Sequence, residues 1–314
     1  MNNKNIVSIF PITLLSDRLV SLRVRRSLTK QSFLLLVIFL FCSILSYADQ
    51  TTDGATTGSQ QLQGFNLNGY NNQGDKTWDV NGTKADISDT NIQITNVDAN
   101  FYGKEQANLT ADHGTINKTN GNVNLKDNVV VTSQDRGTQL TTDTLDWNRN
   151  KDLVSTQDPV KIVDDQGVIT GQGMSAHPNL KKAQINKHVK AKVHTQSKDD
   201  PDDQLITITS DGPMQMNQAL GYAVFNVHVI AVEASTGRQL HCDKMEIWFN
   251  MLTKKIKKGI CTGHVQAIQG TDISYADKMI YEGDTQLLTM IGRPKIIFDT
   301  GSTKGNGMFQ PLGK

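Results

Sequence analysis

The chain of 314 residues lacks a surplus of charge and lacks the common catalytic signatures. Its 32 Lys and Arg residues nearly balance 31 Asp and Glu residues, which leaves a formal net charge of +1. Such a chain has no general attraction for nucleic acid, so we expect no nucleic-acid partner. The sequence contains no G-x-S-x-G elbow, no phosphate-cradling glycine loop and no H-E-x-x-H helix. We therefore predict that the protein is not an enzyme and needs no cofactor.

Long apolar runs are also scarce, and the clearest one lies near the N-terminus, from Phe33 to Leu45. Basic residues precede it, and Ser46 and Ala48 place small side chains where a signal peptidase examines its substrate. A helix of this length spans about 20 Å, less than the hydrocarbon core of about 30 Å. We predict that residues 1–48 form a cleaved export signal, with an uncleaved N-terminal membrane anchor as the alternative.

Cysteine is rare, with three residues in the chain. Cleavage of the signal would remove Cys42 and leave Cys242 and Cys261 in an oxidising compartment. If residues 250–253 form a hairpin turn with a two-residue loop, these two residues face each other and can form a disulfide. The alternative is two small buried thiols, because a register shift of one residue destroys the pairing.

The same segment could also be interpreted as a zinc site made of this cysteine pair with His241 and His264. His241 and Cys242 are adjacent, and adjacent side chains on a strand point to opposite faces of the sheet. We therefore predict no metal site.

From Phe65 onward the sequence consists of short apolar bursts separated by turn signals. Val129 and Val131 precede Asp135-Arg136-Gly137, and each later burst is about five residues long before the next break. Alternation with breaks roughly every 8 to 15 residues is typical of an all-β protein.

Composition divides the chain further. Residues 49–64 are small and polar, which predicts a linker, and residues 196–204 (QSKDDPDDQ) are acidic, which predicts a second linker. These breaks predict two domains, residues 65–195 and 205–298, followed by a disordered tail, residues 299–314.

Short motifs recur at a regular distance. Asp243-Lys244-Met245 returns as Asp277-Lys278-Met279, 34 positions later, and Gly263-His264-Val265 is echoed by Gly292-Arg293-Pro294. A fixed period of this size indicates that one supersecondary unit is stacked repeatedly.

The alternation gives the predicted sheet one apolar face, which must form either a closed core or a partly open groove. An open groove could hold acyl chains at about 0.8 kcal/mol per buried methylene group. The candidates for this inward, lipid-facing surface are Val129, Val131, Leu145, Val160, Ile162, Val227, Val229, Met245, Ile247, Val265, Ile273 and Met279.

These motifs resemble the OstA-like domain of periplasmic lipopolysaccharide-transport proteins. The resemblance rests on the repeats above and on Asn128-Val129, Gly137, Leu140, Asp143-Thr144-Leu145, Asp158-Pro159-Val160 and Gly171-Gln172-Gly173. The first half, with Trp78-Asp79-Val80-Asn81-Gly82, Phe101-Tyr102 and Leu109-Thr110-Ala111, is similar to LptC, and the second half is similar to LptA.

The resemblance implies an all-β fold of two stacked antiparallel β-jellyroll or β-taco domains with an open apolar groove. It implies a periplasmic bridge component that shields the acyl chains of lipopolysaccharide between the inner and outer membranes. An uncleaved N-terminal segment would tether this component to the inner membrane. The implied partners are lipopolysaccharide, an inner-membrane ABC transporter complex, an outer-membrane translocon and other OstA-like domains joined through edge strands. The alternatives are a secreted β-solenoid adhesin without lipid cargo and a carrier of a different outer-membrane lipid.

Overall fold

The computed structural model describes residues 60–102, 106–133, 137–177, 181–194, 205–250, 255–285 and 287–298. All of them belong to the compact unit Gln31–Lys314. The predicted export signal, the acidic linker and the tail lie outside the described residues. Within the described ranges, no helix combines the length and the apolarity needed to cross a membrane.

Seventeen strands form one antiparallel sheet, which confirms the all-β prediction. The strands are β1 (Gln60–Tyr70), β2 (Lys76–Ile87), β3 (Asn91–Phe101), β4 (Ala107–Asn117), β5 (Val123–Ser133), β6 (Gln139–Asn148), β7 (Leu153–Asp164), β8 (Gly167–His177), β9 (Lys182–His194), β10 (Leu205–Ser210), β11 (Met214–Asn217), β12 (Tyr222–Glu233), β13 (Gln239–Phe249), β14 (Ile256–Gln269), β15 (Asp272–Glu282), β16 (Leu287–Ile291) and β17 (Lys295–Ile297). A short 3-10 turn, η3 (Gln218–Leu220), joins β11 to β12. The predicted linker 49–64 overlaps β1, because residues 60–63 pair with β2 in register.

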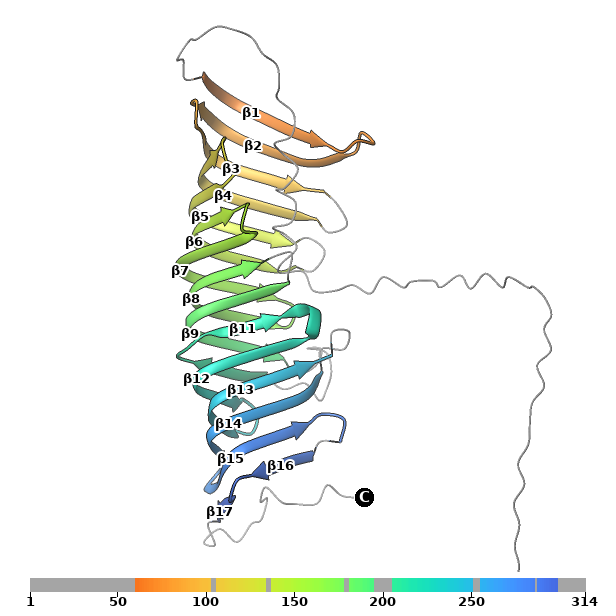
Figure 1. The fold of residues 1–314 in the computed structure, drawn as a ribbon, viewed down its shortest axis with the longest axis vertical. Helices are drawn as coiled ribbons and strands as arrows, with labels where there is room; N and C mark the ends of the chain where they lie inside the picture. Colours follow the sequence, from red (N-terminus) through yellow and green to blue (C-terminus); the bar gives the residue numbers. More distant parts are fainter. Residues whose placement is uncertain are drawn as a thin grey trace, which may run out of the picture. The chain divides into compact units, whose positions relative to one another are not determined.

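The strands follow one another through the sheet in chain order (Figure 1). β10 and β11 share one position, since both pair with β9 on one side and with β12 on the other. Asp211, Gly212 and Pro213 separate the two strands. The sheet therefore continues past the predicted boundary at residues 196–204, and the two predicted domains, which stay a prediction, would share one sheet.

Many strand pairs shift register near their middle. β12, β13 and β14 shift between Asn226 and Val229, between His241 and Lys244, and between Thr262 and Val265. Such bulges bend a strand and increase its twist, so each strand contributes two arms to the sheet. Several bulges contain residues with positive φ: Asp127, Asn128, Val227, His228, Gly263 and His264. Gly292 and Arg293, in the connection between β16 and β17, also have positive φ.

These bends explain the repeated sequence motif. A Cβ atom on Gly263 would overlap the carboxylate of Asp243 on the neighbouring strand, and one on Gly292 would overlap that of Asp277. The residue after the glycine in the first repeat, His264, places Nδ1 2.8 Å from Asp243 Oδ2. The aspartate of one motif and the glycine of the next therefore meet at a corner of the sheet.

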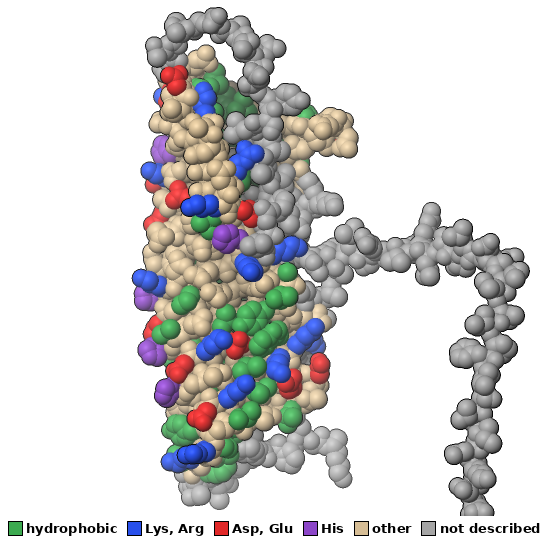
Figure 2. All heavy atoms as spheres, viewed as in Figure 1, with side chains coloured by type: hydrophobic (Ala, Val, Ile, Leu, Met, Phe, Trp, Pro, Cys, Tyr) green, Lys and Arg blue, Asp and Glu red, His purple; other side chains and the backbone are tan. Residues whose placement is uncertain are grey.

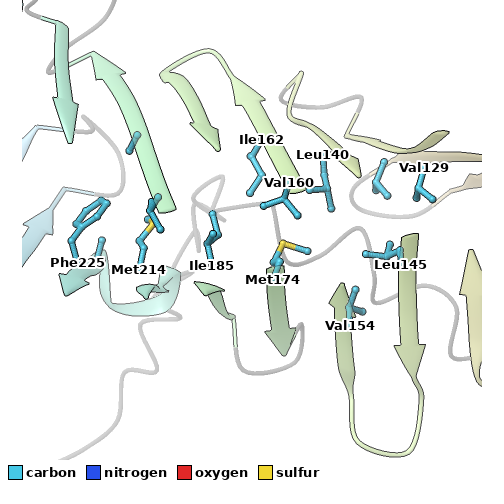
Figure 3. Packing of buried hydrophobic residues seen from close by; sticks show 14 of the residues in the cluster. Val129, Leu140, Leu145, Val154, Val160, Ile162, Met174, Ile185, Met214 and Phe225 are labelled. Carbon is cyan, nitrogen blue, oxygen red and sulfur yellow. The ribbon is translucent and has the colours of Figure 1, made fainter. Parts of the chain in front are cut away.

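The valine that follows the corner lies at the centre of the core. Val129, Val229 and Val265 have at most 1% of their surface exposed. One cluster of buried apolar side chains extends from Val80 on β2 to Met279 on β15. Figure 3 shows part of it, with side chains from β5 to β12 directed toward one another between the strands. Burial of one aliphatic side chain contributes about 1.5–3 kcal/mol, so this inner face is the main source of stability.

Candidate functional site

Nine of the twelve residues predicted to face inward are buried, each with at most 6% of its surface exposed. They come from both halves of the chain: Val129, Val131, Leu145, Val160, Ile162, Val229, Met245, Val265 and Met279. A tenth, Ile247, is half-buried and lines the cavity described below. Their contact with lipid stays a prediction.

The inward direction predicted for Val227 is wrong. Its side chain is 47% exposed, and its backbone has a φ of 67°, followed by 49° at His228. Both residues lie in the bulge of β12, where the two-residue alternation of a strand is interrupted. The corner therefore turns Val227 toward solvent.

The inward direction predicted for Ile273 is also wrong. On β15 the buried side chains at this end are Ser274 and Ala276, while Ile273 is half-buried and Tyr275 is exposed. Alternation therefore places Ile273 on the outer face with Tyr275. Ile273 pairs there with Ile297 of β17.

An apolar cavity of about 240 Å³ lies between the two arms of the sheet. Both halves of the chain line it, with Ile162, Ile169, Ala191 and Val193 from β7 to β9, and Ile206, Ile208, Met214, Met216, Ala223, Phe225, Ile247, Phe249 and Ile256 from β10 to β14. Polar residues border it at Thr138, at residues 164–167, at His194 and at Gln218. A concave apolar site with few polar groups is suited to an apolar ligand.

Sequence reasoning missed most of the residues that line this cavity. Met214 and Phe225 are buried, with 5% and 3% of their surface exposed, and Phe249 packs partly buried against the core. Phe225 lies two positions from Val227 and four from Val229 on the same strand. Extending the alternation toward the N-terminus of β12 would have included it.

The two cysteines do not face each other in the predicted register. The structure pairs Cys261 with Met245 and Cys242 with Val229, because a bulge separates His241 from Lys244 on β13. The assumed two-residue loop register is therefore wrong. Both residues are free and buried.

The two thiols nevertheless interact. A hydrogen bond with Cys261 lowers the pKa of Cys242, against the effect of burial. The same hydrogen bond, together with burial, raises the pKa of Cys261. Neighbouring thiols keep the disulfide chemically accessible, and its formation stays a prediction.

The histidines near this pair do not converge on it. The His264 side chain is 90% exposed and pairs with Asp243 at 2.8 Å, whereas both cysteines are buried. Among the described residues, no group of three or more His, Cys, Asp or Glu side chains is arranged to hold a metal ion.

Both ends of the sheet expose apolar side chains, but in different surroundings. At one end, β1 pairs with β2 and presents exposed Gln and Asn residues together with exposed Leu62, Leu67 and Tyr70. At the other end, β16 and β17 pair with β15 and expose apolar side chains. Figure 2 shows hydrophobic side chains gathered over the later strands, while the visible surface over the first strands is mostly polar. The exposed apolar residues at the end formed by β16 and β17 are Leu287, Leu288, Ile291, Ile297 and Phe298, each more than 40% exposed.

Comparison with known proteins gives one family. Residues 33–194 match the family model described as lipopolysaccharide-assembly, LptC-related. The match ends at His194, where β9 ends. No curated protein sequence matches the chain.

A search of solved structures matches the chain to LptH from Pseudomonas aeruginosa, the LptA-homologous periplasmic component of a lipopolysaccharide transport device. The alignment covers 53% of this chain and 97% of LptH, with 9% identity and a TM-score of 0.30. The family match spans just over half of the chain, and it agrees with the resemblance found in the repeated motifs. The chain therefore belongs to the LptC-related family of lipopolysaccharide-assembly proteins.

Proposed function

We propose that this protein is a segment of a periplasmic bridge that carries lipopolysaccharide between the inner and outer membranes. The observation that carries the proposal is the apolar cavity between the arms, within an inner face that continues from β2 to β15. In the proposal, this face shields the acyl chains from water, and no covalent step takes place.

The energetics of apolar burial suit transport. Each methylene group that leaves water contributes about 0.8 kcal/mol, so a short piece of acyl chain is held by several kcal/mol. The lining is mainly aliphatic, with Ile206, Ile208 and Val193 among its members. Apolar contacts are non-directional, which allows a chain to slide from one set of side chains to the next.

The edges of the sheet support a place in a longer assembly. β1 at one end, and β16 with β17 at the other, have paired neighbours on one side among the described strands. An exposed edge strand is a template for β-augmentation by another chain. We propose that one edge meets the inner-membrane transporter complex and that the other meets a further OstA-like domain or the outer-membrane translocon.

The first test of the proposal is lipid carried by the purified protein. We expect lipopolysaccharide to co-purify with the wild-type chain and to decrease severalfold in Ile247→Asp, because the new carboxylate projects into the cavity. Lys244→Asp is the matched control, since it places a carboxylate on the same strand at a position that is not part of the cavity lining. A wild-type chain free of lipid would contradict the proposal and would favour the adhesin alternative.

A further inference from the structure

Gln218 is a buried polar side chain in the lining of the apolar cavity. Only 8% of its surface is exposed. Among the described residues, no donor lies within hydrogen-bonding distance of its side-chain oxygen, Oε1. Buried side-chain oxygens usually have a partner, so this one calls for an explanation.

The turn that carries Gln218 reverses the usual placement of polar and apolar residues. In η3, Gln218 is buried while Leu220, two positions later, is 69% exposed. Leucine is normally buried and glutamine normally exposed. A turn selected for stability alone would bury the leucine, so the position of Gln218 indicates a role for its amide inside the cavity.

One side-chain and two backbone hydrogen bonds fix the turn in this orientation. The side chain of Asn217 accepts a bond from Leu220 N at 3.3 Å. Gln218 N donates to Lys181 O at 3.1 Å, and Gly221 N donates to Gln218 O at 3.2 Å. Gly221 adopts the left-handed conformation that favours glycine. Gln218 is therefore presented to the cavity by an ordered turn.

A plain hydrocarbon chain would not complete this site. A buried acceptor without a donor costs about 1–3 kcal/mol, and the apolar side chains of the cavity lining, such as Met216 and Phe225, offer no donor. A hydroxyl group both donates and accepts, so it can pair with the amide of Gln218 in either orientation of that amide.

We propose that Gln218 binds a hydroxyl group on an acyl chain and makes the cavity selective for hydroxylated acyl chains. This inference rests on the proposed function, because it assigns a preference to the same lipid cavity. Another polar residue of the lining, Asp164, is engaged locally: its Oδ1 already accepts from the backbone N–H groups of Gln166 and Gly167, both at 2.9 Å.

The test compares two fatty acids that differ by one hydroxyl group. The full chain is loaded with a fluorescent fatty acid, which is then displaced by 3-hydroxytetradecanoic acid or by tetradecanoic acid. One net hydrogen bond corresponds to an affinity difference of roughly fivefold to tenfold. We expect the hydroxylated acid to displace the probe at a concentration lower by that factor.

Two variants with one control assign the preference to Gln218. Gln218→Leu and Gln218→Met replace the amide with apolar groups of similar size, and we expect both to lose the preference. Gln215→Leu is the control, because Gln215 lies on β11 but is exposed and bonds Gln184 outside the cavity. Thermal unfolding of each variant verifies folding, and the comparison of the two acids on the wild-type chain does not depend on how any variant folds.

Each outcome has a defined meaning. Equal displacement by both acids in the wild-type chain, or a preference that survives in Gln218→Leu, overturns the role of Gln218 and leaves the proposed function intact. A failure of both acids to displace the probe overturns the lipid cavity itself, and the role of Gln218 with it.

Discussion

Asp79 shows how this sheet accommodates a charge at a buried position. Its side chain is 5% exposed and lies 2.5 Å from Lys76 Nζ. Tyr102 Oη and Asn100 Nδ2 donate to it at 2.7 Å and 3.0 Å. Burial raises the pKa of Asp79, but the hydrogen bonds from Lys76, Asn100 and Tyr102 outweigh it and hold the pKa below its ordinary value.

Asp79→Ala is expected to lower the free energy of unfolding by about 1–3 kcal/mol, because Tyr102 and Asn100 lose their shared acceptor. Urea denaturation at neutral pH measures the change. Asp89→Ala is the matched control, since Asp89 is exposed in a turn, and surface substitutions usually change stability by less than about 0.5 kcal/mol. Equal effects of the two substitutions would contradict this role for Asp79.

The same carboxyl group predicts a pH dependence. A pKa lower in the folded state than the ordinary 3.8 means that its stabilising effect is complete above that pH. The effect is lost as the pH falls below 3.8 and passes through the folded-state value. We expect the stability difference between the wild-type chain and Asp79→Asn to be largest at pH 7 and smaller at pH 3. Urea titrations at both pH values test this, and a difference that grows on acidification would refute it.

At the level of the strands, the repeated Asp and Gly motifs of the sequence lie at the corners of the sheet. The Asp243 motif and the Gly263 motif lie on neighbouring strands, and each supplies one side of a corner. Glycine is required where a positive φ coincides with a neighbour that leaves no room for a Cβ atom.

Gly263→Ala tests the corner, with Gly270→Ala as its control. Both glycines have positive φ, 78° and 60°, but a Cβ on Gly263 would overlap Asp243, while one on Gly270 meets nothing within 4 Å. The strained backbone alone costs about 1–2 kcal/mol. We therefore expect Gly263→Ala to lower the unfolding free energy by more than Gly270→Ala does. A larger loss at Gly270 in thermal denaturation would argue against the corner model.

The cysteine pair belongs to the same element, the β13–β14 hairpin. We expect Cys242 and Cys261 to form a disulfide in protein exported to an oxidising compartment, because their thiols are in contact. Alkylation of the unreduced, unfolded mature protein followed by mass spectrometry counts the thiols. The predicted result is an unalkylated chain whose mass is lower than that of the reduced chain by two hydrogen atoms. A chain with two alkylated thiols would exclude the disulfide.

Alternation in the sequence predicted the strands and most of the inner face, because a strand exposes every second side chain to the same side. It failed at Val227 and Ile273 and at the register of the cysteines. At Val227 and the cysteines, bulges interrupt the two-residue period of the strand. In the sequence, a few Gly, Asn and His residues are the only sign of these bulges. The burial of Gln218 was not predictable, since the usual preference of leucine for the interior would bury Leu220 instead.

In the whole molecule, one continuous sheet joins the two parts of the chain. β9 pairs with both β10 and β11, so the part matched to the LptC-related family and the part beyond it share hydrogen bonds and one buried cluster. The cavity takes its lining from both parts. This could not be predicted from the sequence, because the acidic residues 196–204 resemble a domain boundary and give no signal that β9 and β10 pair across them.

Site-specific photo-crosslinking in cells tests the central claim most directly. A photoreactive residue at Ile162 or Ile247 faces the cavity, whereas the adjacent Lys161 and Glu246 lie outside its lining. The account predicts that lipopolysaccharide is captured from positions 162 and 247 and not from positions 161 and 246. Equal capture from both faces of β7 and β13, or capture from neither, would contradict it.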